Sequence, residues 1–409
     1  MPGAAIGVLR DGVTATACHG VADVRTGEPV TGETLFSVGS LTKSMVATVI
    51  VRLAAADRLA LDDPVAAHVP ELRACSWAQI ASLRDLLANR SGIPLRAGLE
   101  FDFAGRKDED DGALSRLAAD VAKCEPTVTP WSYTNVGWCL LGRVIETAAA
   151  ATWEDAMRRH LADAGARETK FGTGDSSRRA TGHQVTEDGP VTVEPLTARA
   201  YGPAGATAVS TVADLLRFAA WHLEDPSLHV MREVHAEVAI RGWLDCWCLG
   251  WAGFSWHGGQ VWGWDGLVSG ERSVLRILPD RQAAVVLLAN ASTGRAMYRS
   301  LFAELMKSSF GIEVPPLGLD VSPRADGDLS RYTGVYGWPD HRVEVTSSGS
   351  RLLLQTEDGV TEAHPLDERT FLVDATDPDE PTVTFGAHDA DRRPQVLYRM
   401  LWGLPRLDG

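Results

Sequence analysis

The chain of 409 residues has little of several residue types, and each scarcity excludes a class of protein. Six cysteines, spread from Cys18 to Cys248, are too sparse for a disulfide scaffold, so we expect reduced, structural thiols. No apolar run approaches the roughly 20 residues that a membrane-spanning helix needs. Only five of the 39 basic residues are lysines, which makes each lysine worth inspecting.

Acidic residues outnumber basic ones by 54 to 39, which gives a formal net charge of -15. A surface of that sign repels phosphate backbones and anionic lipids, so we expect neither nucleic acid nor a membrane as a partner. Residues 1–5 have neither the basic nor the apolar segment of a signal peptide, which predicts a cytoplasmic protein. The sequence indicates no oligomeric state.

The order of patterns along the chain predicts an α+β fold. Residues 4–9 and 13–17 flank Asp11-Gly12 and predict a hairpin. Residues 272–278 and 283–290 predict two more strands, and the second is apolar throughout, as in a strand covered on both faces. Strands at both ends with helices between them favour one sheet rather than βαβ repeats. Helical patterns occupy 41–55, 82–88, 136–150, 153–163, 211–223 and 296–307.

A change of pattern near residue 313 predicts a second domain. Residues 313–328 are rich in Pro, Gly and Asp, and we expect a linker there. Short strand candidates at steady spacing then favour a small β-barrel or sandwich. They occupy 332–336, 342–346, 351–355, 370–373, 382–385 and 395–400. We therefore predict a first domain over 1–312 and a β-domain over 329–409.

The strongest local motif is Ser40-Leu41-Thr42-Lys43, at the start of the helical pattern 41–55. Residues three apart share one face of a helix, so the Lys43 amine can reach the Ser40 hydroxyl. A neutral lysine is a suitable base for a serine nucleophile, and the helix N-terminus favours the neutral amine. This spacing alone is weak evidence, because about 0.3 such pairs are expected by chance.

A second motif, Tyr133-Thr134-Asn135, lies about ninety residues further on. Tyrosine and asparagine are so rare in this chain that about 0.04 Tyr-x-Asn triplets are expected by chance. A phenol near an ammonium group can have its pKa lowered and can carry the nucleophile's proton. The two motifs in this order therefore predict a serine active site.

Together the motifs resemble those of the serine β-lactamase and penicillin-binding-protein superfamily, in particular its class C-like branch. That branch includes family VIII carboxylesterases, D-amino-acid-specific peptidases, acyltransferases and penicillin-binding-type thioesterases. The resemblance covers roughly residues 2–310. It implies an antiparallel sheet flanked by helices, an all-helical lobe and a site between them. The C-terminal β-domain would be a lipocalin-like barrel.

The resemblance also implies a role for each motif residue. Ser40 would be the acylated nucleophile, Lys43 its proton acceptor and Tyr133 the third member of the proton relay. Asn135 would bind Lys43 and the acyl side of the substrate. The oxyanion hole would consist of the backbone N–H groups of Ser40 and Leu267, and such donors contribute about 3–4 kcal/mol to acyl transfer.

The third family motif departs from the usual pattern. Relatives usually have Lys or His, then a small or polar residue, then Gly, whereas this chain has Trp264-Asp265-Gly266. We predict that these three residues contribute to substrate binding and that Tyr201 lines the cleft. An indole offers one N–H and no charge, so we expect weak β-lactamase activity and better activity on neutral esters, thioesters or amides. Six tryptophans between 243 and 264 form either an aromatic wall for the acyl group or part of the core.

Three readings of function stay open. The first is a serine acyl-enzyme hydrolase acting on a small-molecule or peptidyl substrate. The second is a transacylase or peptide-cyclising thioesterase that passes the acyl group to an amine or alcohol. The third is a non-catalytic binding protein on the same fold. We find no phosphate loop, dinucleotide fingerprint or zinc spacing, so we expect no cofactor and no metal.

Overall fold

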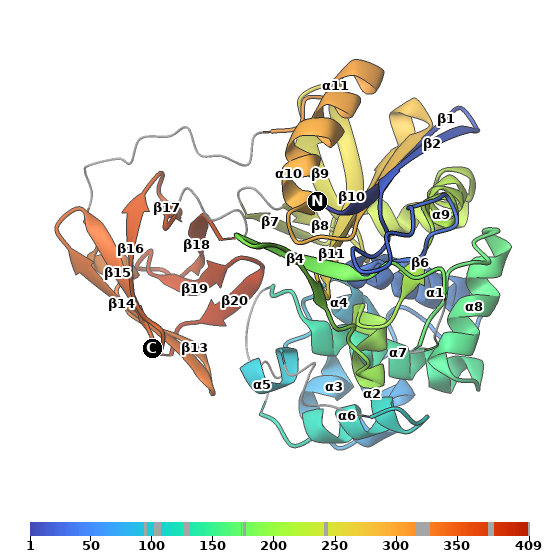
Figure 1. Cartoon of the computed structure of the whole chain (residues 1–409). Helices are drawn as coiled ribbons and strands as arrows, with labels where there is room; N and C mark the ends of the chain where they lie inside the picture. Colours follow the sequence, from blue (N-terminus) through green and yellow to red (C-terminus); the bar gives the residue numbers. More distant parts are fainter. Residues whose placement is uncertain are drawn as a thin grey trace.

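The computed structural model describes residues 1–93, 96–101, 108–125, 131–172, 174, 177–240, 244–315, 328–374 and 380–407. Its larger unit is built on an eight-stranded antiparallel sheet with the order β2-β1-β12-β11-β10-β9-β8-β7 (Figure 1). The strands are β1 (Gly3–Arg10), β2 (Val13–Gly20), β7 (Ala236–Ile240), β8 (Leu244–Trp247), β9 (Ala252–Trp256), β10 (Gly259–Val268), β11 (Glu271–Leu278) and β12 (Ala283–Ala289). The predicted hairpin and the two downstream strands are thus confirmed.

Helices cover both faces of the middle of this sheet (Figure 1). Helix α9 (Val212–Glu224) packs on β1 and β12 so closely that a Cβ at Gly7 would lie 2.7 Å from Val212 Cγ2. The segment predicted as one helix over 296–307 is interrupted. It consists of α10 (Gly294–Met297), a π-helical turn (Tyr298–Phe302) and α11 (Ala303–Phe310). Strand β12 is buried along its whole length, as its apolar sequence predicts.

A helical lobe lies beside the sheet, and α1 (Thr42–Ala55) packs against helices of this lobe (Figure 1). Helix α7 (Asn135–Ala149) runs through the lobe and is largely buried. Thr134 caps α7, because its side chain accepts a hydrogen bond from the Gly137 N–H. The other helices are α2 (Val65–His68), α3 (Ser76–Ile80), α4 (Leu83–Leu87), α5 (Ala97–Glu100), α6 (Ala113–Val121) and α8 (Trp153–Asp163).

Two short strand pairs complete the larger unit. Strand β3 (Phe36–Ser37) pairs with β6 (Val209–Ser210) immediately before the Ser40 turn. Strands β4 (Gly182–Thr186) and β5 (Gly189–Val193) form a separate hairpin. Through the first pair, the segment before Ser40 is held against the segment that follows residues 199–204.

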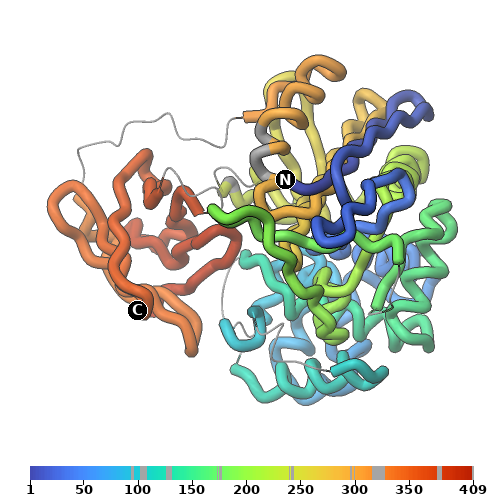
Figure 2. The backbone as a smooth tube through the Cα atoms, viewed as in Figure 1, coloured from blue at the N-terminus to red at the C-terminus, as the bar shows by residue number. Residues whose placement is uncertain are grey.

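The C-terminal residues form a nearly closed antiparallel barrel with the strand order β13 to β20. A bridge between Tyr336 and Arg406 joins its first strand to the end of its last. The chain therefore ends in this second unit, whereas its N-terminus lies at the sheet of the first (Figure 2). The strands are β13 (Gly334–Trp338), β14 (His341–Ser348), β15 (Arg351–Thr356), β16 (Gly359–Pro365), β17 (Thr370–Leu372), β18 (Thr382–His388), β19 (Pro394–Arg399) and β20 (Trp402–Pro405).

The sequence predicted six of these barrel strands and missed β16 and β20. Strand β16 carries few apolar residues, and β20 is short and ends at Pro405. Most of the predicted linker, residues 316–327, lies outside the described residues.

Candidate active site

Ser40 lies on a tight turn between β3 and α1. The turn is a 3₁₀ segment, Gly39–Leu41, and Gly39 has a φ of 51°, which a glycine adopts without strain. The space at Gly39 is also restricted, since a Cβ there would lie 2.8 Å from the backbone nitrogen of Leu267. The turn that carries Ser40 therefore lies directly against the end of β10.

Lys43 lies one helical turn after Ser40 and has no exposed surface. Its Nζ lies 3.1 Å from Ser40 Oγ, 2.9 Å from Asn135 Oδ1 and 2.6 Å from the Ala204 carbonyl oxygen. The carbonyl oxygens of Asn135 and Ala204 only accept hydrogen bonds. A neutral amine therefore donates its two N–H groups to them and turns its lone pair to the Ser40 hydroxyl. This arrangement suits removal of the Ser40 proton.

Burial also supplies the protonation state that this role needs. It lowers the pKa of Lys43 from 10.5 to about 7, and the Glu100 carboxylate opposes that shift. A substantial fraction of Lys43 is therefore neutral near pH 7. The ammonium form is held by the same three oxygens, so the site accommodates the lysine before and after it takes a proton.

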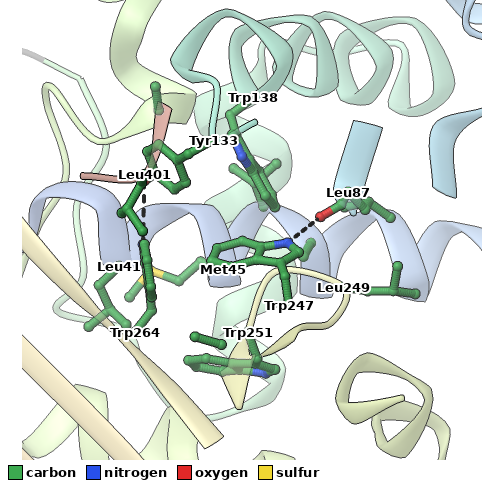
Figure 3. Packing of buried hydrophobic residues seen from close by; sticks show 14 of the residues in the cluster. Leu41, Met45, Leu87, Tyr133, Trp138, Trp247, Leu249, Trp251, Trp264 and Leu401 are labelled. Atoms are coloured by element: carbon green, nitrogen blue, oxygen red, sulfur yellow. Dashed lines mark hydrogen bonds between the residues drawn. The ribbon is translucent and has the colours of Figure 1, made fainter. Parts of the chain in front are cut away.

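Tyr133 is placed at the junction of the helical lobe and the barrel. Its backbone N–H donates to the Leu401 carbonyl over 3.0 Å. Its ring lies beside Trp247 and Trp264, with centroid distances of 5.9 and 5.5 Å (Figure 3). The Trp402 ring lies 6.2 Å away on the same measure. The Tyr133 hydroxyl accepts a hydrogen bond from Trp264 Nε1 over 3.3 Å, and Lys43 Nζ lies 4.8 Å from the centroid of the Tyr133 ring. The three groups Ser40, Lys43 and Tyr133 thus meet in one place.

The protonation state of Tyr133 differs from the sequence-based expectation. Burial raises the pKa of Tyr133 well above its usual value of 10.0, although the hydrogen bond from Trp264 opposes that shift. The phenol is therefore neutral at physiological pH. It is suited to relay a proton through its hydroxyl rather than to act as a phenolate.

Strand β10 brings a backbone N–H to the Ser40 turn. Val268 and Glu271 flank a two-residue turn, so the alternation of the β10–β11 ladder puts the opposed pair Leu267 and Arg272 at a non-hydrogen-bonded position. The Leu267 N–H therefore points away from β11, and β9 pairs only as far as Gly263. A Cβ at Gly266 would lie 1.9 Å from the Val38 carbonyl oxygen, so only glycine permits this approach. The Leu267 backbone nitrogen is thereby brought against the Ser40 turn, as the expected oxyanion hole requires.

Two predicted site residues lie elsewhere. Strand alternation puts Asp265 on the opposite side of β10 from Trp264, where its carboxylate pairs with the buried Arg276 over 2.5 Å. Tyr201 has no exposed surface, and its hydroxyl donates to the Leu99 carbonyl. The printed contacts of both side chains lie outside the Ser40–Lys43–Tyr133 cluster, so their expected roles in substrate binding stay predictions.

The tryptophan-rich segment belongs mainly to the core. Trp247 and Trp251 have no exposed surface, and Trp247 donates from Nε1 to the Leu87 carbonyl over 2.9 Å (Figure 3). Trp264 differs from these two, because its Nε1 donates to the Tyr133 hydroxyl. Trp243 lies outside the described residues. The described tryptophans therefore favour the second alternative, in which this segment is part of the core.

The structure adds contributors to the site that the sequence did not indicate. The Ala204 carbonyl binds Lys43 through the backbone, and Glu100 is a fully buried carboxyl group beside Asn135. The barrel supplies Leu401 and Trp402. A backbone carbonyl, a lone glutamate and a distant hairpin leave no recognisable pattern in one sequence.

Within the described ranges, no helix is long and apolar enough to cross a membrane. The same residues contain no group of three or more His, Cys, Asp or Glu side chains placed to hold a metal ion.

Comparison with known proteins gives matches to one family model and to several proteins. A family model described as Beta-lactamase matches residues 1–305. Penicillin-binding protein 4 of Amycolatopsis lactamdurans is 31% identical over 369 residues, which cover 82% of this chain and 94% of that protein. Esterase EstB of Burkholderia gladioli is 30% identical over 188 residues, which cover 42% of this chain and 47% of that protein.

Among solved structures, the crystal structure of SurE has a TM-score of 0.81 at 28% identity, covering 99% of this chain and 95% of that one. A structure of SurE with D-Leu gives a TM-score of 0.78 at the same identity and coverage. An octameric penicillin-binding protein homologue from Pyrococcus abyssi has a TM-score of 0.65 at 22% identity and shows the fold alone. The match to SurE includes the C-terminal barrel, because it covers nearly the whole chain.

Proposed function

The chain belongs to the β-lactamase family of serine hydrolases, and on this basis we propose that it forms an acyl-enzyme on Ser40 from a neutral ester, thioester or amide. The observation that carries the proposal is the placement of Lys43 Nζ, 3.1 Å from Ser40 Oγ and bonded to two oxygens that only accept. That placement aims the lone pair of a neutral amine at the serine hydroxyl.

The proposed reaction has two halves. Ser40 Oγ forms a bond to the substrate carbonyl carbon while Lys43 takes the hydroxyl proton, and the carbonyl oxygen becomes an oxyanion held by the N–H groups of Ser40 and Leu267. The oxyanion collapses and the leaving alcohol, thiol or amine departs with a proton passed from Lys43 through the Tyr133 hydroxyl. Water then repeats the attack, the acid leaves and Ser40 is regenerated.

Trp264 supports a neutral substrate. An indole carries no positive charge, so Trp264 offers no cation to bind a substrate carboxylate. Its Nε1–H donates instead to the Tyr133 hydroxyl. Tyr133 itself is surrounded by aromatic rings. We infer weak β-lactamase activity and a preference for apolar acyl groups.

The relatives suggest where the substrate search should begin. SurE, which resembles the chain over its full length including the barrel, has a structure with D-Leu. We infer that acyl groups carrying a D-amino acid residue are the first class to test. A panel pairing D- and L-leucyl p-nitrophenyl esters tests this inference, and equal turnover of the two would contradict it.

Transfer of the acyl group to an amine is the second candidate. Aromatic rings and the barrel hairpin lie around Tyr133, and a site from which such groups exclude water would favour other acceptors. Measuring the product ratio with an added amine separates the two outcomes. Free acid as the sole product would exclude transfer under those conditions.

The proposed function is tested by turnover of p-nitrophenyl esters. We expect the Ser40→Ala variant to lose turnover by about 1,000-fold or more, because the nucleophile is removed. Ser44→Ala is the matched control, since Ser44 lies on the same helix and donates to the Gly250 carbonyl rather than to Lys43. Turnover retained by Ser40→Ala would contradict the proposal and favour a non-catalytic role for the site.

A further inference from the structure

We propose that Glu100 is a positioning residue that fixes the Lys43–Ser40 pair by clamping Asn135, and that the C-terminal barrel holds Glu100 in place through Asp340. The inference rests on the proposed nucleophilic role of Ser40. Neither Glu100 nor Asp340 belongs to the sequence motifs, and each is assigned by its contacts alone.

The first step is the clamp on Asn135. Glu100 Oε2 accepts the Asn135 backbone N–H over 2.6 Å, and the Glu100 carbonyl oxygen accepts Asn135 Nδ2–H over 3.1 Å. The second contact fixes which way the amide faces, because it leaves Oδ1 as the group turned to Lys43. Glu100 Oε1 accepts from the Thr134 hydroxyl over 2.5 Å. One residue therefore sets both the backbone and the side chain of Asn135.

The second step is the effect on Lys43. Asn135 Oδ1 is one of the two obligate acceptors that turn the Lys43 lone pair to Ser40. If Asn135 rotated, its amide would offer N–H groups to Lys43, and the amine would lose that constraint. Glu100 also acts through charge, since burial raises its own pKa to about 7 and its carboxylate favours the charged form of Lys43.

Three titratable groups of the described residues face Lys43, and Glu100 is the one carboxyl group among them. Tyr133 is kept neutral by burial, which raises its pKa, and it lies with its ring centroid 4.8 Å from Lys43 Nζ. Cys139, a buried thiol on α7, and Glu100 both favour the charged form of Lys43 and so oppose the effect of burial on its pKa.

The third step connects Glu100 to the barrel. Helix α5 ends at Glu100, and the backbone N–H groups of Ala97 and Gly98 at its start donate to the two Asp340 carboxylate oxygens over 2.9 and 3.1 Å. Asp340 lies in the turn between β13 and β14 of the barrel. On the other side of Glu100, the Phe101 ring stacks against Trp338 and meets Trp402 edge-on, with centroid distances of 6.1 and 5.0 Å.

Both ends of this one-turn helix are thus fixed to the barrel rather than only to the lobe that contains it. A helix of four residues has no stability of its own, so its position depends on such contacts. The Tyr201 hydroxyl donates to the Leu99 carbonyl and so fixes the middle of α5 to the larger unit. The barrel therefore contributes to catalysis through α5 without touching the reacting atoms.

The test measures the rate of labelling by a fluorophosphonate, read by intact mass from about pH 5 to pH 9. We expect Glu100→Ala to slow labelling about 10- to 100-fold, the loss typical of a displaced catalytic group. Glu100→Gln keeps an acceptor for Asn135 and loses the charge. It should restore the plateau rate, and the acid limb should move to lower pH by about 0.5 unit or more.

The barrel step is tested by a double-mutant cycle. Asp340→Ala should slow labelling about 3- to 10-fold, and this loss should disappear in the Glu100→Ala background, since coupled sites are not additive. Asp358→Ala, in the exposed turn between β15 and β16, is the matched control in the barrel. Glu71→Gln is the control for loss of a partly buried carboxylate in the helical lobe, where Glu71 binds Ser115 and Arg143.

The outcomes separate the two proposals. Wild-type labelling with an unchanged rate in Glu100→Ala, or additive losses in the cycle, would overturn this inference alone. If Glu100→Ala does not fold, the Glu100→Gln profile decides, and an unmoved acid limb overturns the inference. A wild-type protein that is not labelled would overturn the proposed function and this inference together.

Discussion

At the residue scale, the reactivity assigned to Ser40 depends on how Lys43 is held. Two oxygens that can only accept occupy two of its three contacts, and the serine hydroxyl occupies the third. The cost of burying the amine is what keeps it available as a base, because burial lowers its pKa to about 7. A lysine at the same spacing on an exposed helix would be an ammonium ion at neutral pH.

The pH dependence of acylation follows from that pKa. Only the neutral amine accepts the serine proton, so acylation should rise as pH increases through about 7 and then level off. At pH 5 we expect a rate about 100-fold below the plateau, since about 1% of Lys43 is neutral there. Burst-phase release of p-nitrophenol across this range measures it. A rate independent of pH between 5 and 8 would show that Lys43 is not the base.

Trp264 is expected to control the charge preference of the substrate. Replacing it in Trp264→His supplies a side chain that can carry a positive charge beside the site. We expect the ratio of nitrocefin to p-nitrophenyl ester turnover to rise about tenfold, as for a new charge-assisted contact. Trp264→Phe, which keeps a ring and adds no charge, is the control. The same ratio in both variants would contradict this role.

The residues differ in how readable they were from the sequence. Ser40 and Lys43 share a helix face, so their contact follows from spacing alone. Tyr133 and Asn135 are joined to them only through tertiary structure and were assigned through a family resemblance. Asp265 was assigned by its neighbours in the motif, although strand alternation alone puts it on the face opposite Trp264.

At the element scale, the junction between the Ser40 turn and β10 depends on glycine. The positive φ of Gly39 and the close approach of Gly266 to the Val38 carbonyl bring the Leu267 backbone nitrogen against the Ser40 turn. Helix and strand lengths were readable from apolar periodicity, as β12 and α7 show. The π-helical turn at 298–302 could not be read from the sequence, because apolar periodicity does not show where the helical hydrogen-bond pattern changes. Strand β16 was missed because most of its residues are exposed or half-buried and give no apolar pattern.

The glycine at 266 gives a prediction for this junction. Gly266→Ala puts a methyl group 1.9 Å from the Val38 carbonyl oxygen, which forces β10 away from the turn and displaces the Leu267 N–H. We expect ester turnover to fall about 100-fold, the loss typical of one oxyanion donor. Gly32→Ala is the control, because its added methyl group meets nothing within 4 Å. Unchanged turnover in Gly266→Ala, with its fold verified by circular dichroism, would contradict the assigned oxyanion hole.

At the scale of the whole molecule, the barrel is part of the site. Its hairpin accepts the Tyr133 N–H at Leu401, and the Gly403 N–H donates to Ser132 Oγ over 3.0 Å. The sequence predicted a barrel but not its contact with Tyr133, since no pattern within a strand shows which distant loop it meets. The barrel therefore helps to position Tyr133, although it lies outside the first domain.

The barrel contact predicts an effect on substrate binding. Trp402→Ala removes a ring that meets both Tyr133 and Phe101, and we expect KM for an apolar acyl ester to rise about 5- to 10-fold. Trp221→Ala, on α9 away from the site, is the matched control. Steady-state kinetics of both variants check this. A rise in KM of the same size in Trp221→Ala would show a general loss of stability instead.

The central claim is that the Ser40 hydroxyl is a nucleophile activated by Lys43. The most direct measurement is intact-mass analysis after treatment with a fluorophosphonate, followed by peptide mapping of the adduct. We predict one adduct per chain, on Ser40, which is absent in Ser40→Ala and strongly reduced in Lys43→Ala. An unmodified chain, or an adduct that persists in Ser40→Ala, would contradict the claim.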